Sequence, residues 1–149
     1  MSRPALLDVN VLVALFNPDH IHHDTAHDWF AEHRADGWAT CPITEQGVVR
    51  ILANPKYWSE FERTAALVER LATFCASGHH HFWSDAISLR DATLFNLSHI
   101  SGHRQLSDVY LLGLAKKMGG RLATFDQTIP LKAVIGASTD TVAVIAQGG

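Results

Sequence analysis

The sequence lacks the features of a secreted, membrane-spanning or disulfide-rich protein. No apolar run approaches the roughly 20 residues that span a bilayer, and the N-terminus does not have the pattern of a signal peptide. The two cysteines, Cys41 and Cys75, lie far apart in apolar segments, which favours reduced core thiols over a disulfide or a zinc knuckle. We therefore expect a cytoplasmic protein with no membrane segment.

The chain also lacks the excess of basic residues that is typical of many nucleic-acid-binding proteins. Its net charge is -3, so contact with a nucleic acid would need a local basic patch or bound cations. By contrast, 47% of the 149 residues are apolar, which is enough to build the core of one domain spanning residues 1–149. No internal repeat or low-complexity segment divides the chain.

Strand-like and helix-like segments alternate through most of the chain. The sequence predicts strands at 5–8, 38–41, 81–84, 121–125 and 139–145. It predicts helices at 24–34, 44–53, 59–76, 91–100 and 107–118, with Asp24 and Ser107 as N-caps of the first and last. This alternation predicts an α/β fold, a three-layer sandwich with a mainly parallel central sheet.

The segment 106–127 contains two acids that we expect to meet. Asp108 heads the apolar stripe of the predicted helix and does not lie on its wet face. Asp126 follows the buried strand at 121–125, at the edge where open parallel sheets place their ligand sites. The helix and the strand should therefore direct two carboxylates to one place.

Asp8, Glu45, Asp108 and Asp126 each lie in or beside an apolar run without an obvious local Lys or Arg partner. A raised pKa, a distant Arg or a metal ion would relieve the cost of burying such acids, and clustered hard oxygen ligands favour Mg²⁺ or Mn²⁺. An ordinary explanation stays open, since Glu45 and Asp108 suit the first turn of a helix and Asp126 suits a turn. For Asp8, the predicted pattern offers no such role, neither as a helix cap nor in a turn.

Four short segments carry a resemblance to a known family. In chain order they are LLDVN, a TE pair that opens a helix, SDVYLLGLA and LATFD. Together they resemble the PIN-domain family, and most of all the VapC toxins of bacterial toxin-antitoxin pairs, over nearly the whole chain. The resemblance implies a PIN-like fold and an endoribonuclease, a phosphodiester hydrolase that depends on Mg²⁺ or Mn²⁺.

The resemblance also assigns the site. The catalytic residues, which are also the metal ligands, would be Asp8, Glu45, Asp108 and Asp126. The supporting polar positions beside the first and last acids would be Asn10 and Thr124. Some family members carry a further acid just after the last aspartate, whereas this chain has Gln127, which argues against a firmly held second ion. A bound ion would orient and acidify the attacking water, so no side-chain nucleophile is needed.

The expected partners are an RNA substrate, a cognate antitoxin protein and a second copy of the chain. Because bare carboxylates repel phosphate, RNA contacts are sought among basic residues near the predicted site, namely Arg104, Arg121, Lys116 and Lys117. For the two lysines, the role of solvated charges at the C-terminus of a helix is the favoured reading. The adjacent aromatics Tyr57 and Trp58 are either a dimer contact or a cap on the core.

Three other functions stay open. Ten histidines, including the pair His23 and His27 and the consecutive run 79–81, allow a histidine-based transition-metal protein, although no Cys or acid motif completes its ligand set. A receiver-like signalling domain also gathers acids around Mg²⁺, but Asp8 has no acidic neighbour and Lys132 follows no strand-like run. A catalytically inactive PIN-like module that only binds a partner is the third.

Overall fold

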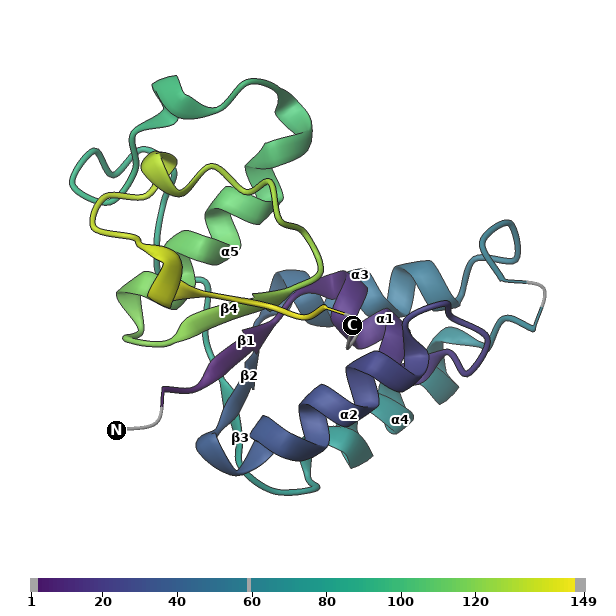
Figure 1. Ribbon diagram of the computed structural model, residues 1–149. Coiled ribbons are helices and arrows are strands. Elements are labelled where there is room, and N and C mark those ends of the chain that lie inside the picture. The colour runs from purple at the N-terminus through teal and green to yellow at the C-terminus, as the bar shows by residue number, and fades with distance from the viewer. Residues whose placement is uncertain (1–2, 59, 147–149) are drawn as a thin grey trace.

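One parallel sheet organises the protein in the computed structural model, which describes residues 3–58 and 60–146 (Figure 1). Its strands are β1 (Ala5–Leu7), β2 (Trp38–Thr40), β3 (His80–Phe82), β4 (Arg121–Thr124) and β5 (Val142–Val144). They lie in the order β3-β2-β1-β4-β5, and every neighbouring pair is parallel. The predicted α/β fold with a parallel central sheet is confirmed.

Helices cover both faces of this sheet. They are α1 (Val9–Phe16), α2 (His23–His33), α3 (Pro42–Leu52), α4 (Thr64–Cys75) and α5 (Leu106–Lys117). Figure 1 shows α1 to α4 on one side of the sheet and α5 on the other, which makes three layers. In the part of the chain that the structure describes, no helix is both long and apolar enough to cross a membrane.

The central strand β1 is apolar on both faces because both faces are covered. Leu7 packs with Val11 and Phe30 in the core under α1 to α4, whereas Leu6 packs with Leu112 in the core under α5. All three residues of β1 are buried. A continuous apolar run, without the alternation of a half-exposed strand, is typical of parallel sheets of this kind.

Several predicted elements have different bounds. Residues 9–16, for which the sequence analysis predicts no element, form helix α1. The predicted helix at 59–76 begins only at Thr64, with Ser59 outside the described residues. The predicted helix at 91–100 was wrong, since that segment consists of turns and a short 3-10 helix at Leu97–His99. Residues 139–141 likewise form a 3-10 turn before β5 begins.

Local side-chain bonds explain why 91–100 is not helical. The Asp91 carboxylate accepts hydrogen bonds from the backbone N–H and the hydroxyl of Thr93, at 2.9 and 2.6 Å. The Asn96 side chain accepts the same two bonds from Ser98. Such bonds to residues two positions ahead compete with the helical pattern and favour turns.

The predicted N-caps of α2 and α5 were also wrong. Asp24 and Ser107 lie inside the first turns, and the cap positions belong to His22 and Gln105, neither of which makes a side-chain cap bond. The predicted end of α5 is confirmed, because Gly119 follows the C-cap with a left-handed φ of 73°. A glycine adopts this conformation without the steric cost that other residues pay.

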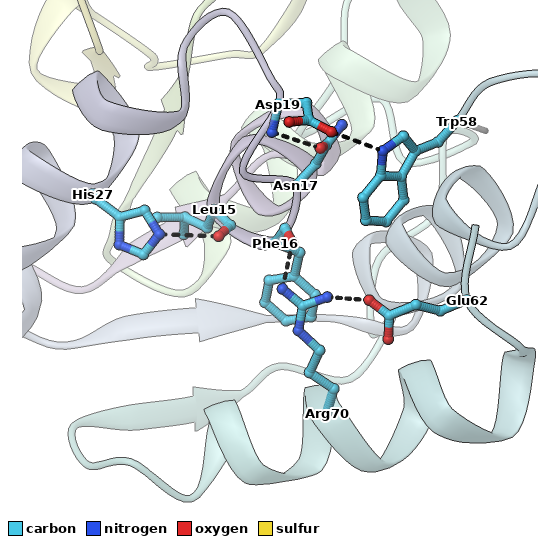
Figure 2. A network of polar contacts seen from close by, with 8 residues as sticks. All are labelled: Leu15, Phe16, Asn17, Asp19, His27, Trp58, Glu62 and Arg70. Carbon is cyan, nitrogen blue, oxygen red and sulfur yellow. Dashed lines mark hydrogen bonds and ion pairs between the residues drawn. The ribbon is translucent and has the colours of Figure 1, made fainter. Parts of the chain in front are cut away.

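The C-terminal end of α1 is held by side chains from later segments (Figure 2). The Arg70 guanidinium of α4 donates to the Phe16 carbonyl and to the Glu62 carboxylate, and lies 4.8 Å from the centroid of the Phe16 ring. His27 Nε2 lies 3.0 Å from the Leu15 carbonyl. These groups satisfy carbonyls that have no partner inside the helix.

The histidine pair of α2 therefore has a structural role. His23 Nδ1 lies 2.7 Å from the Ala14 carbonyl, in the same turn of α1 that His27 contacts. The two imidazole rings are edge-on to each other, with centroids 4.4 Å apart. Both rings thus have backbone partners, which explains their one-turn spacing without a metal.

The adjacent aromatics Tyr57 and Trp58 have different environments. Trp58 packs partly buried against the core, and its indole N–H donates to Asp19 at 3.4 Å (Figure 2). Tyr57 is 45% exposed. The core-capping role fits Trp58, and Tyr57 is left as a surface aromatic that a partner could cover.

Candidate functional site

The carboxyl ends of the two central strands bring two of the predicted acids together. Asp8 directly follows β1, and Asp126 follows β4 by two residues. Leu7 is paired in register with Ala123, so both acids lie at the same edge of the sheet. The Thr124 hydroxyl joins them, since it donates to Asp8 Oδ2 at 2.7 Å and accepts from the Asp126 N–H at 3.1 Å.

Asp8 is buried and begins α1. Its Oδ1 accepts from the Val9 N–H at 2.7 Å, so Asp8 is the N-cap of that helix. The expectation that Asp8 has no cap to serve was wrong. Burial raises the pKa of Asp8 above its usual value and the charge of Asp126 adds to this rise, while the bonds from Thr124 and Val9 oppose it.

The third carboxylate comes from the opposite layer. Asp108 lies half-buried in the first turn of α5. Burial raises the pKa of Asp108 to about 6, and the charges of Asp8 and Asp126, together with a hydrogen bond with Asp126, act in the same direction. Three aspartates from three separate segments are therefore close enough to repel one another.

No basic side chain in the described ranges neutralises these acids. Within residues 3–58 and 60–146, the one ion pair joins Arg70 to Glu62, on the α4 side of the fold. A group of carboxylates in which the pKa values of Asp8 and Asp108 are raised, and which has no cationic partner, fits either a shared proton or a divalent cation. Hard oxygen donors are those that Mg²⁺ and Mn²⁺ prefer.

Glu45 makes a hydrogen bond of its own at the carboxyl edge of the sheet. Glu45 lies in the first turn of α3, and its carboxylate accepts from the Thr40 hydroxyl at 2.7 Å. Ligand atoms of Glu45, Cys75 and His80 lie within 4.8 Å of one another. The place of Glu45 in the predicted group of four acids stays a prediction.

The group of Glu45, Cys75 and His80 changes the interpretation of the cysteines and histidines. Cys41 and Cys75 are both free, as predicted. Burial raises the pKa of the Cys75 thiol to about 11, and the charge of Glu45 adds to this. Ligand atoms of an acid and a cysteine lie beside His80 in the structure, a grouping that no sequence motif indicated.

Two predicted polar residues lie near the aspartates on the surface. Asn10 is exposed in the first turn of α1, two residues after Asp8. Arg104 is exposed in the 3-10 turn that precedes α5, at the end of the helix that carries Asp108. Their supporting and RNA-binding roles stay predictions.

The other predicted RNA-binding residues lie away from the acids. Arg121 begins β4, at the amino edge of the sheet, and its guanidinium lies 5.9 Å from the centroid of the Trp29 ring. Lys116 and Lys117 form the last turn of α5, and Lys116 is about 12 Å along the helix axis from Asp108 at the usual rise per residue. These residues are close in sequence to Asp108 and Asp126, but each lies at the opposite end of its helix or strand from the acids.

Sequence reasoning also missed Thr40 and Cys75. Thr40 ends β2 as Thr124 ends β4, and each hydroxyl donates to a carboxylate at the carboxyl edge of the sheet. A threonine at the end of an apolar strand, shortly before an acid, was the available signal for Thr40. For Cys75 there was none, since its contact with Glu45 depends on how α4 packs.

Comparisons with known proteins agree with this fold and site. The model of the PIN domain matches residues 5–134. Ribonuclease VapC44 of Mycobacterium tuberculosis (strain ATCC 25618 / H37Rv) is 40% identical over 141 residues, which cover 95% of this chain and 99% of that protein. Ribonuclease VapC39 of the same strain is 41% identical over 132 residues, 89% of this chain and 95% of that protein.

A solved structure supports the fold alone. A chain in the structure of FitAB bound to an IR36 DNA fragment superposes with a TM-score of 0.59 at 18% identity, covering 94% of both chains. The match to the PIN model and the identity to the two VapC proteins extend over most of the chain. The chain therefore belongs to the PIN domain family, among its VapC members.

Proposed function

We propose that the chain is an endoribonuclease, acting as one nuclease domain and as the toxin of a toxin-antitoxin pair. The observation that carries this proposal is the meeting of Asp8, Asp108 and Asp126, without a neutralising Lys or Arg in the described residues. The similarity to proteins named ribonucleases supports RNA as the substrate. The reaction is hydrolysis of a phosphodiester bond.

The three aspartates would hold one divalent ion, Mg²⁺ or Mn²⁺. The raised pKa values of Asp8 and Asp108 and the oxygen donors of all three aspartates fit such an ion better than a shared proton, because the carboxylates left charged after one protonation still repel each other. When bound, the ion supplies an acidified water and stabilises charge on the phosphate. Glu45 would be a fourth ligand, since its carboxylate accepts a hydrogen bond from Thr40 as that of Asp8 does from Thr124.

The protein's own residues prepare this site. Thr124 fixes the orientation of Asp8 and positions the backbone of Asp126 through one hydroxyl. The N-cap bond to Val9 holds the second oxygen of Asp8, so this carboxylate does not turn freely. Exposed Arg104, four residues before Asp108, would contact the RNA backbone, where phosphate contacts supply binding free energy.

Two protein partners belong to the same proposal. A cluster of carboxylates is a docking point for an Arg or Lys from an antitoxin, which would exclude both ion and RNA. A second copy of the chain is the other partner, and the 45% exposed Tyr57 is a candidate contact between copies.

The test replaces single aspartates by asparagine, which keeps size and removes charge. RNA cleavage with Mg²⁺ or Mn²⁺ should fall by more than about 100-fold in Asp8→Asn and Asp108→Asn, because even outer partners of metal ligands contribute about 10–100-fold. Asp91→Asn is the matched control, since Asp91 lies exposed in a turn that asparagine also forms. Cleavage by either site variant at the parent rate contradicts the assignment.

Two further arms complete this experiment. Expression of the parent chain should stop bacterial growth, while expression of Asp108→Asn should not. Glu45→Gln is compared in the same assay: a loss equal to that of Asp108→Asn supports Glu45 as a ligand, and cleavage at the parent rate excludes it from the ligand set.

A further inference from the structure

Three aromatic rings gather beside Asp126. Phe125 directly precedes Asp126, and His20 and His22 belong to the α1–α2 loop (residues 17–22). The centroid of the Phe125 ring lies 4.8 Å from that of His22, at an interplanar angle of 31°, and 6.4 Å from that of His20, at 17°. All three residues are half-buried. A group of rings with part of its surface open to solvent therefore borders the proposed ribonuclease site.

Hydrogen bonds fix the shape of the α1–α2 loop. The buried Asn17 side chain accepts from the Asp19 N–H at 2.9 Å, and the Asp19 carboxylate accepts from the Trp58 indole (Figure 2). The Asn17 carbonyl accepts from the His20 N–H at 3.0 Å. His20 Nδ1 in turn accepts from the His22 N–H, also at 3.0 Å. The two imidazoles are thus positioned before a ligand arrives, which lowers the entropy cost of binding it.

The His20 ring is neutral in this arrangement. Its Nδ1 accepts a hydrogen bond from a backbone N–H and so carries no proton, which leaves the proton on Nε2. Burial lowers the pKa of His20, and the neighbouring His22 and His23 act in the same direction. A neutral ring interacts through its aromatic face and not as a cation.

The chemistry of these rings suits an unpaired RNA base. Proteins that recognise single-stranded RNA stack its splayed bases on Phe, Tyr, Trp or His side chains. Between the two histidines, Ile21 is 80% exposed, so the α1–α2 loop presents further apolar surface to solvent. The chain has a net charge of -3, and stacking supplies binding free energy that does not depend on positive charge.

We propose that Phe125, His20 and His22 form a stacking platform for one unpaired base of the RNA substrate. This proposal rests on the proposed ribonuclease function and adds that the cleaved segment is single-stranded. Because Phe125 and Asp126 are consecutive, with α carbons about 3.8 Å apart, the stacked base belongs to a nucleotide beside the cleaved bond. The other explanation is that the three rings only pack the α1–α2 loop against the end of β4.

RNA affinity tests the platform without relying on cleavage. A labelled single-stranded oligoribonucleotide is titrated with Asp108→Asn, which should leave the RNA intact, by fluorescence anisotropy with Mg²⁺ present. Adding Phe125→Leu keeps an apolar side chain and removes the aromatic face. The dissociation constant should rise by at least about 5-fold, since stacking contributes about 1–3 kcal/mol per base and about 1.4 kcal/mol is tenfold. Phe125→Tyr should retain most of the affinity.

A second exposed phenylalanine provides the matched control. Phe82 is 55% exposed at the end of β3. Strand β3 lies three strand spacings, roughly 14 Å, from β4. Phe82→Leu removes an equivalent ring and should leave the RNA affinity unchanged.

An abasic nucleotide in the RNA tests the stacking contact itself. Abasic nucleotides are placed at each position of the oligoribonucleotide in turn. At one position the loss of affinity should be as large as that caused by Phe125→Leu. In Phe125→Leu the same abasic change should have little further effect, because both changes remove one contact. His22→Leu should show this coupling, and His81→Leu, on the exposed edge strand, should not.

Two results would overturn the platform. One is equal RNA affinity in Phe125→Leu and Phe82→Leu, and the other is additive losses at every abasic position, which a packing role alone would give. Should Phe125→Leu not fold, the comparison of His22→Leu with His81→Leu decides in the same way. A parent chain that does not cleave RNA would reject the ribonuclease proposal alone, since the abasic coupling is measured by binding.

Discussion

Replacing Asp108 by asparagine should make the metal-free protein more stable at neutral pH. The charge on Asp108 is unfavourable in the folded state because it is half-buried beside Asp8 and Asp126. Asparagine keeps the shape and removes this charge. Asp108 would then serve activity at a cost in stability. This is expected where a protein gathers like charges to bind a ligand.

The magnitude follows from the pKa of Asp108, which is about 6 in the fold against 3.8 ordinarily. Two pKa units correspond to about 3 kcal/mol at about 1.36 kcal/mol per unit. Partial exposure screens the charge, so we expect about 1–2 kcal/mol. Since the folded pKa is the higher one, the parent gains stability as pH falls through 6 toward 3.8, and the advantage of Asp108→Asn should disappear at about pH 4.

Urea unfolding of parent and variant, with chelator, at about pH 7.5 and about pH 4 measures this difference. The control is Asp91→Asn: hydrogen bonds from Thr93 lower the pKa of Asp91, so its charge favours the fold and its removal should not stabilise. Added Mg²⁺ or Mn²⁺ should stabilise the parent more than Asp108→Asn. The reasoning would be refuted if Asp108→Asn were no more stable than the parent at about pH 7.5. It would also be refuted if the stability difference between variant and parent were as large at about pH 4 as at about pH 7.5.

Two further predictions concern packing and assembly. Gly47→Ala in α3 should lose about 1–2 kcal/mol of unfolding free energy, because the new Cβ would lie 2.7 Å from Val9 Cγ2, and this overpacking exceeds the gain of about 1 kcal/mol in helix propensity. Val9→Ala in the same chain should recover much of the loss, and equal urea midpoints for Gly47→Ala and parent would contradict the contact. Light scattering of the free protein should give twice the 16.4 kDa chain mass, and a monomer mass would reject the dimer.

The sequence was sufficient to predict the fold class and the position of three acids. Asp8 and Asp126 could be placed because parallel strands expose their carboxyl ends at one edge, and Asp108 because it heads the apolar stripe of a helix. The direction of Glu45 could not be predicted. It depends on the rotation of α3 against the sheet, which buries Thr44 and turns its neighbour Glu45 toward α4.

Helix α1 was missed for a different physical reason. Residues 11–16 are all buried, so the segment has no polar face and no helical period that a sequence pattern could reveal. Because helix α1 was not predicted, the role of Asp8 as its N-cap could not be predicted either. Asp8 thus combines a structural bond with a place in the acid cluster, and Asp8→Ala would remove both at once.

The pairing of β1 with β4 has a consequence for biosynthesis. Ala5 pairs with Arg121, so the central strand β1 cannot complete its hydrogen bonding until β4, near the other end of the chain, has been synthesised. A ribosome releases the N-terminal half first, and that half holds Asp8 but neither Asp108 nor Asp126. The three carboxylates cannot meet until synthesis is nearly complete, so a cell making this protein meets the assembled acid cluster only in finished, folded chains.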